Sequence, residues 1–139
     1  MQTENSNVTG GCLCGGIRYA INGPLRPVIN CHCTQCRRTS GHFVAATAAD
    51  RKHLTLVNDS GLRWYYSSNI ARRGFCHTCG SSLFWDPTDD ESSHISIMAG
   101  TLDGPMGLET KANIYTDDVG DYYKLDEDIP QLPQGGYGL

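Results

Sequence analysis

The sequence predicts a mainly β fold, built from short antiparallel strands with one or two short helical turns. Two observations lead to this prediction. Short segments rich in β-branched and aromatic residues recur along the chain, and clusters of Gly, Pro, Asn and Asp separate them. The chain has 139 residues, of which 39% are hydrophobic, so we expect a single domain over residues 1–139 with one modest core.

The expected strands follow one another closely. Gly16–Ile21 alternates in strand fashion, with Ile17, Tyr19 and Ile21 on one face. His42–Ala49 fits either a buried strand or a short helix, and the Phe and Val near its start favour a strand. Further strands are expected at His53–Val57, Leu62–Ser67, Ser82–Trp85, His94–Ala99 and Lys111–Thr116.

Turns and one helix connect these strands. A helix of one or two turns should begin at about Thr34, and Gly41 should end it. Turn-forming sequences lie at Asn58–Gly61, Asp86–Asp90 and Leu102–Gly107.

Both ends of the chain are predicted to be poorly ordered tails, at residues 1–9 and 131–139, because the first is polar and the second is rich in Pro and Gly. The polar start lacks the basic and apolar regions of a signal peptide, and no apolar run reaches the roughly 20 residues of a membrane span. The net charge of −4 gives no basic surface for nucleic acid. We therefore expect a soluble, cytoplasmic protein that binds neither nucleic acid nor a membrane.

Seven cysteines point to metal binding. In a reducing compartment, clustered cysteines are metal ligands more often than disulfides, and an odd total does not suit a pure disulfide framework. Tetrahedral zinc holds its sulfur ligands about 3.7–3.8 Å apart, which C-x-C and C-x-x-C spacings can achieve. The cysteines form three groups: Cys12 with Cys14, Cys31 with Cys33 and Cys36, and Cys76 with Cys79.

Two of these groups make a complete zinc site. The pairs Cys12–Cys14 and Cys76–Cys79 supply four thiolates, which leave no open position and so predict a structural zinc. Such a site would cross-link distant parts of a small domain and thereby stabilise it. The fold is therefore expected to be zinc-stabilised, with two zinc ions per chain.

The third group supplies only three ligands. Three thiolates with a vacant fourth position are typical of a catalytic zinc, so Cys31, Cys33 and Cys36 predict an open site. Two alternatives remain. A histidine or carboxylate could close this site, with His42 the better placed because His32 would point away from the metal in an extended segment; or the cysteine groups could combine differently.

Five sequence blocks resemble the family of glutathione-dependent formaldehyde-activating enzymes, which includes centromere protein V. The blocks cover most of the chain and are GGCLCGGIRY, CHCTQCRRTSG, RRGFCHTCGSSLFW, AGTLDGP and DEDIPQLPQ. The resemblance implies a β-rich fold of tent-like sheets around zinc. It also implies a structural zinc at Cys12, Cys14, Cys76 and Cys79, and a second zinc at Cys31, Cys33 and Cys36.

The resemblance further implies a carbon–sulfur lyase that resembles S-hydroxymethylglutathione synthase, which joins glutathione to formaldehyde. Relatives often carry a tryptophan before the final LP element, where this chain has Tyr122 and Tyr123. Because glutathione carries two carboxylates, we expect Arg37 and Arg38, which follow the three-cysteine group, to bind substrate. Two alternatives are a non-catalytic zinc module that binds a protein partner and a glutathione or aldehyde carrier without turnover.

Overall fold

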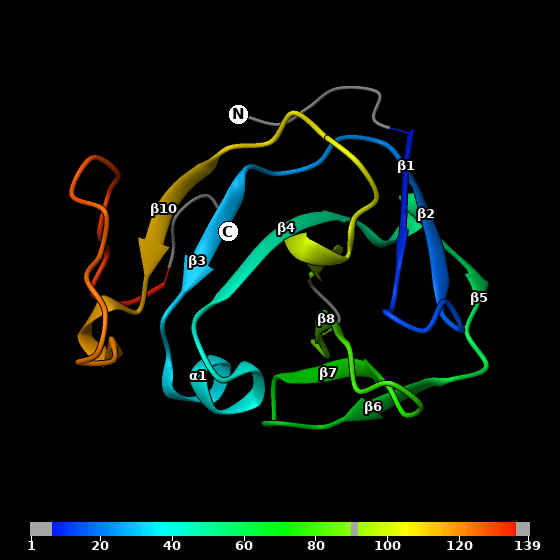
Figure 1. Ribbon diagram of the computed structural model, residues 1–139, viewed down its shortest axis with the longest axis horizontal. Helices are drawn as coiled ribbons and strands as arrows, with labels where there is room; N and C mark the ends of the chain where they lie inside the picture. Colours follow the sequence, from blue (N-terminus) through cyan, green and yellow to red (C-terminus); the bar gives the residue numbers. More distant parts are fainter. Residues whose placement is uncertain (1–6, 90–91, 136–139) are drawn as a thin grey trace.

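Ten strands form two sheets in residues 7–89 and 92–135, the part of the chain that the computed structural model describes. The smaller sheet has the order β1-β2-β5, with β1 at Asn7–Gly11, β2 at Arg18–Asn22 and β5 at Leu54–Asn58. The strands of the larger sheet arch around the centre of the molecule (Figure 1). In spatial order they are β10 (Thr110–Ile114), β3 (Val28–Cys31), β4 (Val44–Asp50), β9 (His94–Met98), β8 (Ser82–Pro87), β7 (Ala71–Cys76) and β6 (Leu62–Tyr65).

The predicted mainly β class is confirmed, with one difference in strand direction. Every pair of neighbouring strands is antiparallel except β10 and β3, which run parallel. This parallel pair joins segments far apart in the sequence, because Asn113 pairs with Asn30 and Ile114 with Cys31. The segment after β10 therefore lies beside the segment that enters the cysteine motif.

Three strands have no counterpart among those expected from the sequence. β1 contains two glycines and a single β-branched hydrophobic residue, β3 is only four residues long, and β7 carries two arginines and a glycine. Their hydrophobic alternation is therefore too weak to predict a strand. Backbone pairing with neighbouring strands stabilises them instead. In the larger sheet, β7 lies between β6 and β8, and β3 lies between β10 and β4.

The one α-helix of the described residues, α1, runs from Thr34 to Ser40, as the sequence predicts. The Cys33 side chain caps its start by accepting a hydrogen bond from the backbone N–H of Cys36 at 3.3 Å. Gly41 ends the helix in the left-handed conformation, with φ at 87°. Short 3-10 turns follow β4, β9 and β10, at Arg51–His53, Ala99–Thr101 and Thr116–Asp118.

Some residues of the two predicted tails make regular backbone pairings. Residues 7–9 belong to β1, where Val8 pairs with Ile21 of β2. Near the other end, Asn113 donates a backbone hydrogen bond to Pro130 and accepts one from Leu132, both at 2.9 Å. The edge strand β10 needs partners for its backbone groups, and this terminal segment supplies them. Residues 1–6 and 136–139 lie outside the described part.

The main core lies between the two sheets and joins them. Ile17, Tyr19 and Ile21 are each at most 1% exposed, which confirms their predicted common face. Tyr19 meets Phe84 of the larger sheet edge to face, with ring centroids 5.4 Å apart. A second, smaller core cluster contains Cys36, Val44, Ala46 and Met98. Among the described residues, the structure contains no helix that is long and apolar enough to span a membrane.

Candidate metal centres and cavity

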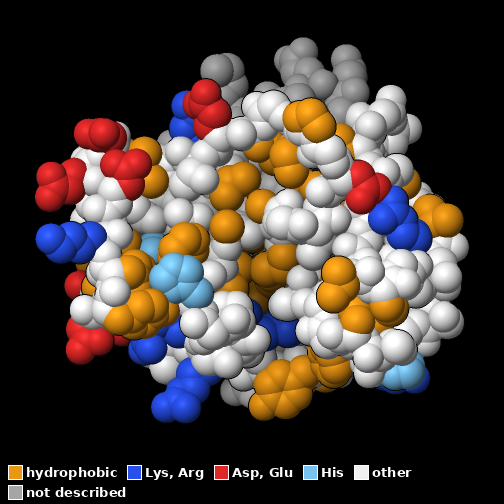
Figure 2. All heavy atoms as spheres, in the orientation of Figure 1, with side chains coloured by type: hydrophobic (Ala, Val, Ile, Leu, Met, Phe, Trp, Pro, Cys, Tyr) orange, Lys and Arg blue, Asp and Glu red, His pale blue; other side chains and the backbone are white. Residues whose placement is uncertain are grey.

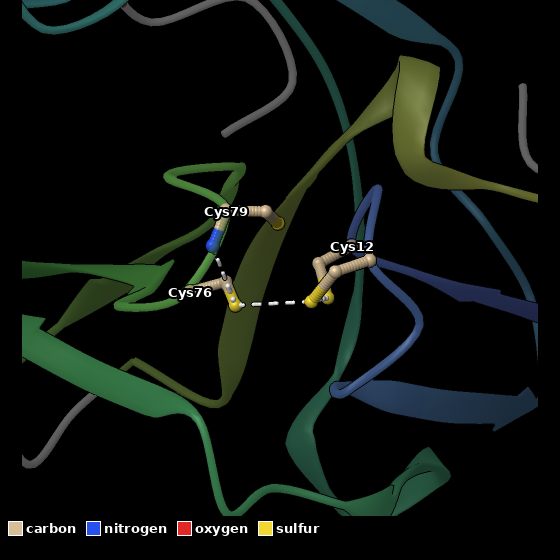
Figure 3. A group of neighbouring side chains, drawn as sticks. Cys12, Cys76 and Cys79 are labelled. Carbon is tan, nitrogen blue, oxygen red and sulfur yellow. Dashed lines mark hydrogen bonds between the residues drawn. The ribbon is translucent and has the colours of Figure 1, made fainter.

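Cys12, Cys14, Cys76 and Cys79 form a four-cysteine cluster in which all sulfur atoms lie within 4.8 Å of one another. The Sγ atoms of Cys12 and Cys14 are 3.5 Å apart, and those of Cys14 and Cys76 are 3.8 Å apart. Figure 3 shows Cys12 facing Cys76 and Cys79 across a common centre. These separations are close to the ~3.8 Å that tetrahedral zinc imposes on its sulfur ligands. The donor set and its spacing therefore fit a closed structural zinc site.

Two turns build the four-cysteine cluster. One connects β1 to β2 and the other connects β7 to β8, with Gly15 and Gly80 in the left-handed conformation at φ of 80° and 79°. A hydrogen bond from the backbone N–H of Leu13 to Ser81 Oγ, 2.9 Å long, holds the two turns together. Hydrogen bonds from the side chain and the backbone of Ser81 lower the pKa of Cys79 to about 5. The cluster is thus arranged to carry thiolate, the form that binds metal.

Cys31, Cys33 and Cys36 form a three-cysteine cluster, also with all sulfurs within 4.8 Å of one another. Cys31 is the last residue of β3, Cys33 caps α1, and Cys36 lies on the first turn of the helix, 5% exposed. Hydrogen bonds from the Cys31 and Cys36 thiols lower the pKa of Cys33 to about 2. The cluster therefore carries thiolate at neutral pH and fits a soft metal such as zinc.

The two clusters contain the same cysteines as the groups formed by counting in the sequence. No cysteine is exchanged between them, and neither group of converging ligand atoms includes a histidine or carboxylate among the described residues. That zinc occupies either cluster stays a prediction.

A cavity of about 660 Å³ opens beside the three-cysteine cluster. All three of its cysteines line the cavity, whereas no member of the four-cysteine cluster does. Much of the wall is apolar and comes from Ile29, Val44, Ala46, Trp85, Met98 and Ile114. Figure 2 shows a central hollow on this face, where hydrophobic and Lys or Arg side chains lie together. Of the two candidate metal sites among the described residues, the three-cysteine cluster is thus the one that lines this ligand-sized cavity.

Arg73 of β7 is the cation that contacts the three-cysteine cluster. The residue is 7% exposed, and its Nη1 and Nη2 each donate to Cys36 Sγ at 3.8 Å. Further bonds run from Nη2 to Gln35 Oε1 at 3.4 Å and from Nη1 to Thr39 Oγ1 at 3.5 Å. None of the ion pairs between described residues includes Arg73, and its buried Nε has no hydrogen-bond partner there. The negative charge that faces this arginine is therefore the thiolate of the cluster.

The arginines that line the cavity differ from those expected in the sequence. Arg37 and Arg38 lie on the last turn of α1, and neither lines the cavity. Arg37 Nε donates to the backbone oxygen of Asp118 at 3.2 Å. Arg26 and Arg73 line the cavity instead. Sequence spacing favours Arg37 and Arg38 over Arg73, because 37 residues separate Arg73 from Cys36; substrate binding by Arg37 or Arg38 stays a prediction.

His32 is turned away from the three-cysteine cluster, as the sequence suggests. It is 1% exposed, and burial lowers the pKa of its ring, which is therefore neutral at neutral pH. Its Nε2 lies 2.7 Å from Asn113 Oδ1, and its Nδ1 lies 2.7 Å from the Tyr123 hydroxyl. The amide oxygen accepts only, so Nε2 carries the proton and Nδ1 accepts from Tyr123. His42 Nδ1 likewise pairs with the Tyr122 hydroxyl, at 2.7 Å.

Replacing Tyr123 with phenylalanine should destabilise the protein, because it leaves the buried Nδ1 of His32 without a donor. We expect a loss of about 1–3 kcal/mol in the free energy of unfolding, measured by urea denaturation. Tyr122→Phe is the matched control, because it removes the equivalent hydroxyl from a side chain of which 60% is exposed. The control should change stability by less than about 0.5 kcal/mol. Equal effects of the two variants would contradict this role for Tyr123.

Comparison with known proteins identifies the family. The family model described as glutathione-dependent formaldehyde-activating enzyme matches residues 7–118. The chain belongs to this family. A protein of Schizosaccharomyces pombe that is named an uncharacterized lyase is 29% identical over 115 residues, which cover 82% of each chain. A crystal structure of a Rhodobacter sphaeroides protein has a TM-score of 0.57 at 22% identity, with 88% of this chain and 98% of that chain covered, and so shares the fold.

Proposed function

We propose that this member of the glutathione-dependent formaldehyde-activating enzyme family is a zinc-dependent carbon–sulfur lyase. It joins a thiol, glutathione or a similar one, to formaldehyde or a related small aldehyde, as in formaldehyde detoxification, and the reverse reaction cleaves the adduct. The observation that carries the proposal is the asymmetry of the two clusters, since only the three-cysteine cluster lines a ligand-sized cavity. We place the protein in the cytoplasm, where cysteines remain reduced.

Both clusters have the donor set of zinc, and they differ in what zinc would do there. The four-cysteine cluster of Cys12, Cys14, Cys76 and Cys79 would hold a structural ion with no open position. Cys31, Cys33 and Cys36 would hold a zinc ion with a position left for a thiol, whose pKa the ion would lower.

The side chains around the cavity suit an addition of thiolate to an aldehyde. The guanidinium of Arg73 would offset the negative charge of the three-cysteine cluster, and the apolar wall, which includes Trp85 and Met98, would limit the access of water to the reacting groups. The thiol loses its proton, the sulfur lone pair forms the carbon–sulfur bond, and the π electrons of the carbonyl move to its oxygen. That oxygen then takes up a proton in place of the one that the thiol released. Thiol and aldehyde therefore combine without oxidation or reduction.

A glutathione carrier without turnover is the second candidate. Among the described residues, the cavity lining contains no histidine, and its acidic residue is Asp118, whose side chain is exposed. The lining therefore offers no buried group of ordinary general-base type, which is compatible with binding alone. A zinc module for a protein partner would need neither the cavity nor the access of the three-cysteine cluster to it.

The test is the rate of adduct formation from glutathione and ¹³C-labelled formaldehyde, followed by NMR with and without the zinc-loaded protein. The lyase should form S-hydroxymethylglutathione faster than the spontaneous reaction, in proportion to protein concentration. Glutathione binding without acceleration would identify the carrier. Neither binding nor acceleration would leave the protein-interaction module as the function.

A further inference from the structure

Arg26 lies on the loop between β2 and β3, and its backbone is fixed against β4. Its N–H donates to Ala48 O at 2.9 Å, and its carbonyl oxygen accepts a hydrogen bond from Thr47 Oγ1. Thr47 is fully buried, so this attachment belongs to the interior of the larger sheet. From this fixed point the Arg26 side chain extends along the wall of the cavity that the three-cysteine cluster also lines. Its position relative to the cluster is thus set by rigid strands.

The charge of Arg26 has no counter-ion in the described part of the chain. Its guanidinium donates only to backbone carbonyl oxygens, from Nε to Pro27 at 3.3 Å and from Nη2 to Ala46 at 3.0 Å. None of the ion pairs between described residues includes Arg26. Burial lowers its pKa to about 10, so the group is still a cation at neutral pH. A half-buried cation without an anion is costly, and a bound anion would offset this cost.

Arg26 and Arg73 therefore contact different groups within the same cavity. Arg73 already faces the sulfur of Cys36, while Arg26 forms no ion pair with any described residue. The cavity volume of about 660 Å³ exceeds what the reacting thiol group and formaldehyde alone would fill. It lies within the range of roughly 300–1,000 Å³ that is typical of small-molecule binding sites. The cavity thus suits a larger thiol whose sulfur lies at the cysteines and whose anionic end lies at Arg26.

We propose that Arg26 binds a carboxylate of the thiol substrate and makes the cavity specific for thiols that carry a carboxylate. This inference rests on the proposed function for the presence of the thiol, but not on turnover. It assigns the recognition of glutathione to a residue that lies five positions before Cys31 in the sequence, in place of Arg37 and Arg38. Thiols without a carboxylate would then lack this contact and bind more weakly.

The test compares two probes and three proteins by calorimetric titration of the zinc-loaded chain. The probes are glutathione and its diethyl ester, in which both carboxylates are masked. The wild type should bind glutathione at least tenfold more tightly than the ester, and Arg26→Met should lose this preference through weaker binding of glutathione alone. Arg63→Met is the matched control: Arg63 is exposed, does not line the cavity and donates only to the carbonyl oxygens of Ser60 and Leu62. It should keep the preference in full.

Arg26→Lys tests whether the preference for glutathione depends on the charge of Arg26 or only on its structural role. It also provides a second variant in case Arg26→Met fails to fold. Lysine keeps the charge but not the fork of donors to Pro27 and Ala46, so it should retain most of the preference for glutathione over the ester. Equal affinity of the wild type for the two probes, or an unchanged preference in Arg26→Met, would overturn the proposal. The rate of adduct formation is measured separately, so absent turnover with an intact preference would reject the lyase and leave the role of Arg26 standing.

Discussion

Cys76→Ser is expected to lower the midpoint of thermal unfolding by ten degrees or more, or to yield no folded protein. Cys76 is fully buried within the main core, and its sulfur meets that of Cys14 from a turn 62 residues away. Structural zinc sites contribute about 10–16 kcal/mol to small domains, so a loss of even a third of that value suffices at roughly 4 °C per kcal/mol. Circular dichroism melting with parallel metal analysis measures both consequences.

A control must separate the effect of metal loss in Cys76→Ser from the effect of replacing the side chain itself. A folded Cys76→Ser variant with an unchanged midpoint would show that the four-cysteine cluster does not hold a stabilising metal. Treatment of the wild type with a strong chelator should imitate the variant, because it removes the same cross-link without changing a side chain.

Cys33→Ser supplies the matched comparison and the second large effect. Both Cys33 and Cys76 begin a C-x-x-C motif, and each sulfur accepts a hydrogen bond from the N–H three residues later, at 3.3 and 3.5 Å. Serine is a favourable helix cap, so Cys33→Ser should keep α1 and cost less than about 1 kcal/mol. A hydroxyl is a poor partner for a soft metal site. The variant should therefore hold one zinc per chain instead of two and lose all acceleration of adduct formation.

Comparison of these two variants tests whether the four-cysteine cluster is structural and the three-cysteine cluster catalytic. If Cys33→Ser lowers the unfolding midpoint as far as Cys76→Ser does, the three-cysteine cluster is structural as well, which favours the non-catalytic zinc module. If Cys33→Ser retains two zinc ions, a further ligand must complete that site. If it loses one ion but still accelerates adduct formation, the reaction does not depend on the three-cysteine cluster.

The cysteine grouping could be predicted from sequence because it depends on short spacings and on arithmetic. C-x-C and C-x-x-C place sulfurs within reach of one metal whatever the rest of the fold does, and pairing two groups leaves the third incomplete. The strand expected at Gly16–Ile21, which the structure contains as β2 at Arg18–Asn22, could also be predicted, since Ile17, Tyr19 and Ile21 alternate strictly. Local patterns of this kind need no knowledge of the topology.

Spacing in the sequence could not show which cations line the cavity, because the topology decides it. Arg73 reaches Cys36 only because the fold brings β7 close to α1, and Arg26 reaches the cavity only because its loop is attached to β4. The parallel pairing of β10 with β3 is a further example, since no local signal in Thr110–Ile114 indicates its partner. Proximity in sequence favoured Arg37 and Arg38, but a helix turns successive side chains in different directions, and neither residue lines the cavity.

The different loop lengths of the two clusters have a consequence for how the newly made chain acquires its metals. Cys31, Cys33 and Cys36 lie within six positions, so their sulfurs can gather as soon as this short stretch has been synthesised. The four-cysteine cluster must first bring together turns 62 residues apart, which requires closing a long loop at a high entropic cost. Zinc supply during biosynthesis should thus fill the local site early and the long-range site late, so that scarcity of metal would limit the completion of folding more than the loading of the reactive centre.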